Sequence, residues 1–239
     1  MKYSMSTKFW HDEDDAGLLS RLERLFEMEF FQGTVLRPRS DRLPPTRANL
    51  HRVLQPDRHQ TSDVRFVVDR GKKSLRGELS IIRNSEWTAS RFTSSLGLDF
   101  SLSECYKGGP FHGVDEIRDL LLACVQVGPS AMGFVKCEDE SSEQHSANFE
   151  RFRNLDSMAV PVTIEWVTVL HKDVVAAMEV DLMNAAAAAG ARAGRQGDYW
   201  WIILTEEPFS FMKAAHEQKY RAMREAVGLD DIHAKFPRR

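Results

Sequence analysis

The chain has 239 residues, of which 42% are hydrophobic and 28% charged, so it can bury a core without disulfides or metals. No run approaches the roughly 18 apolar residues that span a bilayer, and the first residues lack the apolar segment of a signal peptide. Cys105, Cys124 and Cys137 lie far apart, which argues against a disulfide scaffold and a C-x-x-C motif. We expect one soluble cytoplasmic domain over residues 1–239, with no membrane partner.

The formal net charge of −3 combines segments of opposite charge. Residues 32–83 hold twelve Lys and Arg against five Asp and Glu, an excess of +7, whereas residues 1–31 sum to −3 and residues 138–150 to −5. The sequence pI of about 6.3 is far below the value above about 9 that is typical of nucleic-acid-binding domains. Nucleic acid is therefore an unfavoured partner, although the basic segment leaves that alternative open.

The chain starts with a pattern that predicts a strand and then a helix. Residues 3–9 alternate between polar and less polar side chains, as a half-exposed strand does. The acidic residues 12–15 suit the first turn of a helix, where carboxylates complement the positive end of the helix dipole. The apolar face of this helix comprises Leu18, Leu22, Leu25, Phe26 and Phe30. We expect the helix to end near Gly33, which can adopt a left-handed cap.

Residues 37–62 read as a long loop, because four prolines there disfavour helix interiors and sheet ladders. One helical turn is possible between Arg47 and Leu54. The arginines of this segment are Arg37, Arg39, Arg42, Arg47, Arg52 and Arg58. They could contact phosphates, but few aromatic residues lie between them for base stacking, so solvation or docking on an acidic protein surface is the favoured interpretation.

Strands and helices then alternate irregularly. Further strands are expected at residues 64–68, 79–82, 87–92, 98–102, 132–137, 160–170 and 199–204, with a turn at 94–97. Further helices are expected from Asp115 to Gly128, from Asp173 to Ala189 and from Pro208 to Gly228. The six consecutive apolar or aromatic residues at 199–204 indicate a central strand buried on both faces. This order predicts an α+β fold, a mostly antiparallel or mixed sheet flanked by three to four helices.

No segment carries a specific catalytic or metal-binding motif. Residues 11–15 contain metal-ligand residue types, but consecutive side chains at a helix start diverge, so helix capping is the better interpretation. Residues 107–113 form a glycine-containing loop that matches neither G-x-G-x-x-G nor G-x-x-x-x-G-K-[ST], the two phosphate-binding patterns. Pro110 also lacks the backbone N–H that such a loop would donate to a phosphate. Glu206 and Glu207 follow the predicted central strand and are the best placed pair of carboxylates, although a solvated rim is favoured. We therefore expect no enzymatic activity, no metal and no cofactor.

The acidic segment from Glu138 to Glu143 suits electrostatic recognition of a basic partner. An exposed negative loop can mimic a nucleic-acid backbone and occupy the basic cleft of a nuclease. The alternative is an ordinary solvated loop.

Three hydrophobic motifs carry a resemblance to a known family. They are V-P-V-x-I-x-W at 160–166, G-D-Y-W-W-I-I-L-T-E-E-P-F at 197–209 and V-G-L at 227–229. Over residues 160–230 the chain resembles immunity protein family fifty-two, α+β proteins of polymorphic-toxin and type VI secretion systems. The Arg-rich segment has no counterpart in that pattern.

This resemblance implies a partner, a cognate secreted toxin with a restriction-endonuclease-like nuclease domain, which the protein would neutralise by stoichiometric binding without catalysis. The residues expected to contact it are Asp12, Glu13, Asp14, Asp15, Glu138, Asp139, Glu140, Glu143, Glu206 and Glu207. Two alternatives remain: a nucleic-acid-binding or nucleic-acid-processing protein that uses residues 37–58, and an adaptor or chaperone for a secreted effector.

Overall fold

The computed structural model describes residues 2–11, 15–38, 41–55, 61–70, 73–82, 92–101, 111–126, 130–137, 160–161 and 163–235. The strands are β1 (Lys2–His11), β2 (Thr34–Arg37), β3 (Thr61–Arg70), β4 (Lys73–Ile82), β5 (Phe92–Ser101), β6 (Ser130–Cys137), β7 (Val167–His171), β8 (Arg192–Gln196) and β9 (Tyr199–Ile203). The helices are α1 (Asp15–Glu27), the 3-10 turn η1 (Glu29–Phe31), α2 (Arg47–Val53), α4 (Val114–Gln126), α6 (Lys172–Met178), α7 (Leu182–Ala188), α8 (Ala214–Ala226) and α9 (Leu229–Lys235). The predicted α+β class is confirmed.

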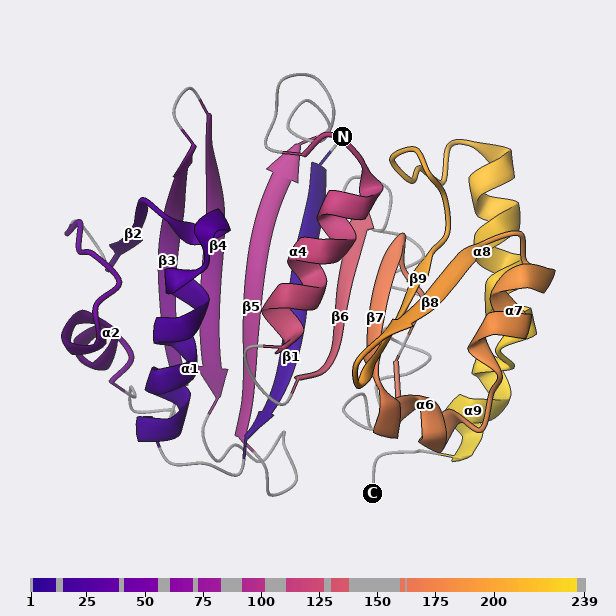
Figure 1. The fold of residues 1–239 in the computed structure, drawn as a ribbon, viewed down its shortest axis with the longest axis horizontal. Helices are drawn as coiled ribbons and strands as arrows, with labels where there is room; N and C mark the ends of the chain where they lie inside the picture. Colours follow the sequence, from indigo (N-terminus) through magenta and orange to yellow (C-terminus); the bar gives the residue numbers. More distant parts are fainter. Residues whose placement is uncertain are drawn as a thin grey trace.

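The described strands form one antiparallel sheet in the order β2-β3-β4-β5-β1-β6-β7-β9-β8 (Figure 1). The first strand of the chain is therefore the middle strand of the sheet, and it joins β5 on one side to β6 on the other. The prediction that residues 199–204 form a central strand is wrong, because β9 lies next to the edge strand β8 and leaves Trp200 and Trp201 partly exposed.

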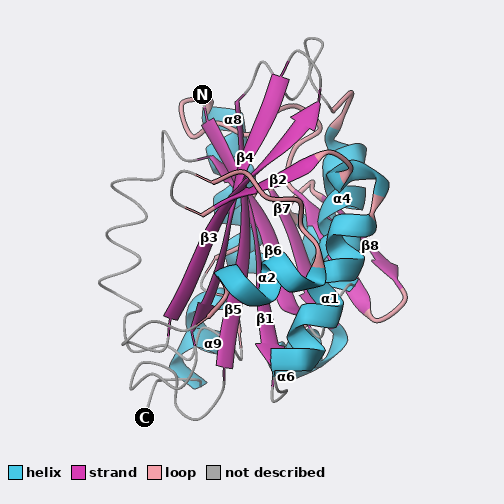
Figure 2. Ribbon diagram, turned by 90° about the vertical axis from the view of Figure 1, so that its left-hand side faces the viewer, coloured by secondary structure: helices cyan, strands magenta, loops and turns pink. Residues whose placement is uncertain are grey.

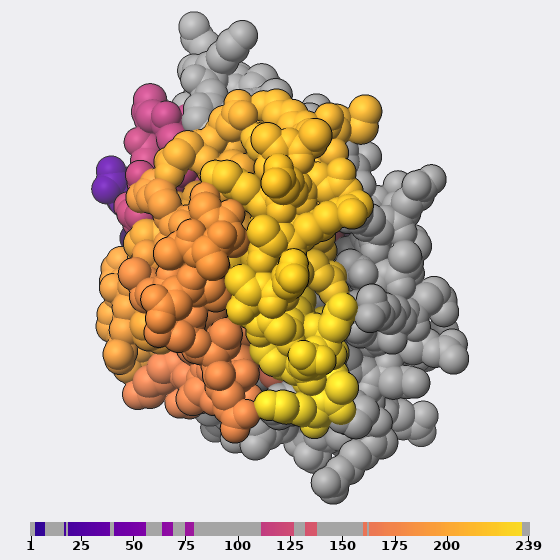
Figure 3. Space-filling model, turned by 90° about the vertical axis from the view of Figure 1, so that its right-hand side faces the viewer, coloured from indigo at the N-terminus to yellow at the C-terminus, as the bar shows by residue number. Residues whose placement is uncertain are grey.

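Helices cover both faces of the sheet. Figure 2 views the sheet from its β2 end and shows α1, α2 and α4 on one side of the strands and α8 and α9 on the other. A Cβ atom on Gly133 of β6 would lie 2.7 Å from a Leu121 methyl carbon of α4, so the glycine permits this close packing. At the far end, α7 and α8 lie side by side (Figure 3). Burial on both faces explains why β7 is mostly apolar and buried along nearly its whole length.

The first third of the chain follows the predicted pattern with one addition. The strand predicted at residues 3–9 is confirmed as β1, and those predicted at 64–68 and 79–82 are confirmed as parts of β3 and β4, which pair in antiparallel fashion. The first helix ends at Glu27, and η1 continues to Phe31 before Gly33 adopts a positive φ of 78°. The proline-containing segment holds α2, whose N-terminus is capped by the Thr46 side chain. β2 ends at Arg37, where this segment begins, and is too short to show a periodic pattern. Thr61 and Ser62, predicted as the end of the loop, are the first residues of β3.

Three predicted boundaries are wrong. Residues 94–97 lie inside β5 rather than in a turn, because Gly97 and its polar neighbours pair with both β1 and β4; residues 87–91 lie outside the described residues. Residues 163–166 precede β7 as irregular chain. The alanine-rich helix is two helices, because Glu179 adopts a left-handed φ of 56° and Asp181 caps a new start.

The last helix is confirmed only in part. His216, Tyr220 and Met223 are buried on the inner face of α8, but Met212 precedes the helix and is 85% exposed. Gly228 adopts a φ of 60° between α8 and α9. With α2, the divided alanine-rich segment and α9, the described residues hold more helices than the predicted three to four.

The motifs that carry the family resemblance build one part of the core. The Trp166 indole donates to the Thr205 carbonyl at 2.9 Å, and the Leu204 N–H donates to the Trp166 carbonyl at 2.9 Å. The Tyr3 ring of the middle strand packs at a tilt against Trp166, with 5.1 Å between the ring centroids, and its hydroxyl donates to the Phe209 carbonyl at 3.1 Å. The loop after β9 is thereby held against both the start of β7 and the centre of the sheet.

Candidate functional site

Most of the predicted partner-binding residues cannot be placed. Asp12, Glu13, Asp14, Glu138, Asp139, Glu140 and Glu143 lie outside the described residues. Asp15 is the first residue of α1, as its predicted place in a first turn requires. Glu206 and Glu207 are described and exposed, in the loop that follows β9.

Glu206 and Glu207 are neighbours in sequence but bind different cations. Glu206 accepts from Arg192 of β8 at 2.7 and 2.9 Å. Glu207 accepts from Lys213 at 2.8 Å and is 2.9 Å from His216. The two carboxylates therefore do not converge, and the possibility that they act together as an acid–base pair is not supported by their geometry.

The Glu207 contacts fasten the loop to the start of α8. His216 is only 6% exposed; its Nδ1 accepts from the Ser210 N–H at 3.1 Å, so Nε2 carries the proton and donates to Glu207. The hydrogen bonds from Lys213 and then His216 lower the pKa of Glu207 below its ordinary value. His216 is therefore a hydrogen-bonded residue at the edge of the core.

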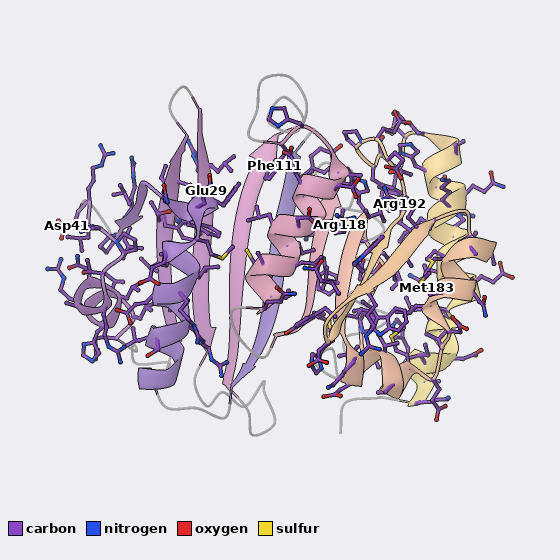
Figure 4. The ribbon with its side chains drawn as sticks, in the orientation of Figure 1. Glu29, Asp41, Phe111, Arg118, Met183 and Arg192 are labelled. Atoms are coloured by element: carbon purple, nitrogen blue, oxygen red, sulfur yellow. The ribbon has the colours of Figure 1, made fainter. Side chains whose placement is uncertain are left out.

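Glu206 belongs to a larger surface group centred on Trp201. We call Asp115, Arg118, Arg192, Trp201 and Glu206 the Trp201 cluster. The guanidinium groups of Arg118 and Arg192 both lie over the Trp201 ring, 4.8 and 5.8 Å from its centroid. These distances are in the range of cation–π attraction. Figure 4 labels Arg118 and Arg192 where α4 meets the β8–β9 hairpin.

The hairpin positions Trp201 through its partner residue. A two-residue turn at Gly197 and Asp198 pairs Trp201 with Gly194, and Gly197 has the positive φ of 60° that such turns favour in glycine. A Cβ atom on Gly194 would lie 2.4 Å from the Trp201 ring, so the indole lies directly across the glycine. The Lys172 N–H and ammonium hold the Asp198 carbonyl and carboxylate at 2.8 and 3.1 Å, which fixes the hairpin tip.

Carboxylates from two other segments complete the cluster. Asp115 accepts from Arg192 at 3.1 Å and also from Arg118, so it links α4 to β8. Arg118 is only 17% exposed, whereas Glu206 is 64% exposed. The hydrogen bond that Arg192 donates to Glu206 raises the pKa of Arg192 above its ordinary value, so the guanidinium stays charged. The result is a pre-organised surface of one aromatic ring and charge-paired arginines.

Such a surface is suited to recognition. Trp and Arg are over-represented among the residues that dominate protein–protein binding energies, and rigid side chains lose little entropy on binding. Sequence reasoning did not find Arg118, Arg192 or Trp201. The signal was present in part: once residues 197 and 198 are taken as a two-residue turn, Gly194 must lie opposite Trp201.

Two arginines of the Arg-rich segment form ion pairs with carboxylates of this chain. Arg47 donates to Glu23 and Ser20 of α1 at 2.9 Å, and Arg52 donates to Asp41 at 3.1 Å. Arg39 and Arg58 lie outside the described residues. In this part of the molecule the ion pairs attach α2 to α1 and to its own loop.

The described residues show neither a metal site nor a membrane-spanning helix. No three His, Cys, Asp or Glu side chains of the described ranges come together as metal ligands, and none of the described helices is both long and apolar enough to cross a membrane. Cys124 and Cys137 are buried free thiols, and burial raises the pKa of Cys124 to about 12. Cys105 and most of the loop before Phe111 lie outside the described residues.

No family model matches the chain, and a search of curated proteins finds no match either. Functional inference therefore rests on the residues and geometry of the chain itself.

Proposed function

We propose that this chain is an immunity protein that neutralises a cognate secreted bacterial toxin, of the nuclease class, by stoichiometric binding. The proposal includes no catalysed step. It takes the partner class from the resemblance of residues 160–230 to immunity protein family fifty-two, and it takes the binding surface from the Trp201 cluster.

The same motifs supply both the support and the surface. Their buried residues, such as Trp166 and Ile202, form a core that fixes the loop after β9. The partly exposed Trp200 and Trp201 and the exposed Glu206 lie on one hairpin and its following loop. A protein that acts by binding needs this combination, because a rigid frame lowers the entropy that its contact residues lose.

The Trp201 cluster is the observation that carries the proposal. An indole that is partly exposed, with two guanidinium groups held over it, presents a large contact area with little remaining freedom. Residues of this kind contribute about 2 kcal/mol or more each to tight interfaces, roughly a 30-fold change in Kd.

Co-expression with the product of the neighbouring gene tests the function. The toxin alone should arrest growth of a bacterial host, the toxin with this chain should not, and the two proteins should co-purify in equal amounts. Trp201→Ala should raise Kd about 30-fold, because it removes the ring on which the cluster is built. Absence of both protection and co-purification would overturn the proposal, as would nucleic-acid binding by the purified chain that tightens at low salt.

Arg192→Ala and Arg52→Ala form a matched pair of variants. Each removes one arginine that pairs with a carboxylate at the surface, 43% and 60% exposed respectively. Arg192 belongs to the Trp201 cluster, whereas Arg52 pairs with Asp41, which Figure 4 labels at the opposite end of the molecule. Toxin binding should weaken for Arg192→Ala and stay unchanged for Arg52→Ala. Equal effects would assign the interface elsewhere.

A further inference from the structure

The two edges of the sheet differ in how their outer backbone groups are used. At the β2 edge, Leu36 donates its N–H to the Leu43 carbonyl at 2.8 Å and accepts from the Leu43 N–H at 3.0 Å. Pro44 and Pro45 follow directly, and prolines discourage further pairing. At the β8 edge, no strand of the described residues pairs with the outer side of β8.

The hairpin register determines which β8 groups face outward. Gln196 and Tyr199 flank the two-residue turn, and the backbone N–H and C=O groups of each bond to those of the other. In an antiparallel ladder every second residue pair is hydrogen-bonded in this way. Ala193 and Arg195 are the alternate residues, so their N–H and C=O groups point away from β9. The Ala191 N–H, one step earlier, already donates to Ala186 of α7 at 2.9 Å. The open part of the edge is therefore Ala193 to Arg195.

The open edge carries basic side chains. β8 has the sequence R-A-G-R-Q, with two arginines and no acidic residue. Arg192 is already neutralised by Glu206 and Asp115. Arg195 lies 5.8 Å over the Trp200 ring and donates to the Gly197 carbonyl at 2.9 Å, and within the described residues it makes no ion pair. A strand added here would place its side chains beside this exposed guanidinium and the Trp200 ring.

We propose that the outer edge of β8, from Ala193 to Arg195, binds an extended acidic segment of the partner protein as an additional strand of the sheet. The backbone groups would supply affinity, and a carboxylate beside Arg195 would supply specificity. A second copy of this chain is a poorer occupant, because β8 paired with β8 would bring the two Arg195 side chains onto the same face of the sheet without an acid from either strand. The identity of the partner as a toxin rests on the proposed function, whereas the edge itself can be tested without it.

Peptide binding to the purified full chain tests the edge directly. The probe is a fluorescein-labelled peptide of alternating Glu and Val, with a Lys–Val peptide of the same length as its counterpart. Fluorescence anisotropy should show binding of the Glu–Val peptide and not of the Lys–Val peptide. Amide hydrogen exchange at Ala193 and Arg195 should slow in the presence of the Glu–Val peptide. Equal binding of both peptides, or unchanged exchange at these amides, would overturn the proposal.

Ala193→Pro and Ala193→Ser separate the backbone from the side chain. Proline removes an N–H that points away from β9, so it costs no ladder hydrogen bond and is acceptable in an edge strand; thermal unfolding verifies the fold of both variants. Ala193→Pro should weaken binding of the Glu–Val peptide about tenfold, since it removes one hydrogen bond and obstructs the approaching strand. Ala193→Ser keeps the N–H and should bind as the wild type does. Equal affinities for the two variants would refute strand addition.

The toxin assay then distinguishes the two proposals. If the wild type protects and Ala193→Pro protects equally well, the edge proposal is wrong and the function stands. If the Glu–Val peptide binds at the edge while the neighbouring gene product is not neutralised, the function is wrong and the edge site stands. Self-association that Ala193→Pro abolishes would assign the edge to a second copy and overturn the acidic-segment proposal.

Discussion

Phe66 and Gly77 face each other across β3 and β4, and the phenyl ring lies over the glycine. A Cβ atom at position 77 would lie 2.1, 2.4 and 2.7 Å from three ring atoms of Phe66. Real Cβ contacts do not approach so closely, so Gly77→Ala forces the ring to move. The substitution adds one methyl group and no polar atom, which makes its effect a measure of packing alone.

The ring has little room to move. Phe66 is buried, and its centroid is 5.5 Å from that of Phe26 and 6.3 Å from that of Phe31, both in edge-to-face contact. Overpacking of such a core costs about 1–3 kcal/mol, and alanine recovers about 0.5–1 kcal/mol that glycine loses in a strand interior. We expect a net destabilisation of about 1 kcal/mol, which lowers Tm by about 2–4 °C for a chain of this size.

Thermal and urea unfolding of the full chain measure this effect, with Gly113→Ala as the control. A Cβ atom at Gly113 meets no atom within 4 Å, so this control should change Tm by little. The double variant Phe66→Leu with Gly77→Ala tests the cause, because leucine lacks the ring atoms that meet the new methyl group. If Gly77→Ala is as stable as the wild type, or costs the same in the Phe66→Leu background, the packing explanation is refuted.

Two further predictions concern the loop and hairpin of the candidate site. Gly194→Ala should cost less stability than Gly77→Ala, because the partly exposed Trp201 ring can swing outward; a shift in tryptophan fluorescence and weaker toxin binding should report the movement, and an unchanged spectrum would contradict it. The folded-state pKa of Glu207 is lowered, chiefly by Lys213, so its ion pair with Lys213 and its hydrogen bond from His216 add stability above the ordinary carboxyl pKa of 4.5, and that stability disappears as pH falls through the lower folded value. The Tm difference between the wild type and Glu207→Gln should therefore shrink from pH 7 to pH 3, and a constant difference would show that the charge of Glu207 contributes nothing.

Local elements of this protein could be predicted because local physics governs them. Alternating side chains at residues 3–9, the paired runs at 64–68 and 79–82, and the apolar face of α4 each identify one face of one element. Predictions were wrong where a local sequence pattern is compatible with two different structures. The alanine-rich segment suits a helix throughout, but Asp181 offers its own capping hydrogen bonds to Met183 and Asn184, and the chain restarts there.

The candidate site could be predicted only in part. Glu206 and Glu207 were found as exposed charges after a strand, which their position in the chain indicates. Their separation into two ion pairs was not, because Arg192 approaches from a neighbouring strand and His216 from a later helix. The sequence predicts that Trp201 belongs to a strand buried on both faces. Six consecutive apolar residues do not indicate which of them are covered by other elements and which remain partly exposed.

By itself the sequence determined the α+β class, most of the strands and helices, and the strong core of residues 160–230, because hydrophobic periodicity and capping act over a few residues. Only the tertiary structure decided that β1 is the middle strand, that β8 is an open edge and that Arg192, which lies over Trp201, pairs with Asp115 and Glu206. Strand order and surface clusters depend on contacts between residues far apart in the chain, 77 positions for Asp115 and Arg192. Contacts of that kind leave no periodic trace in the sequence.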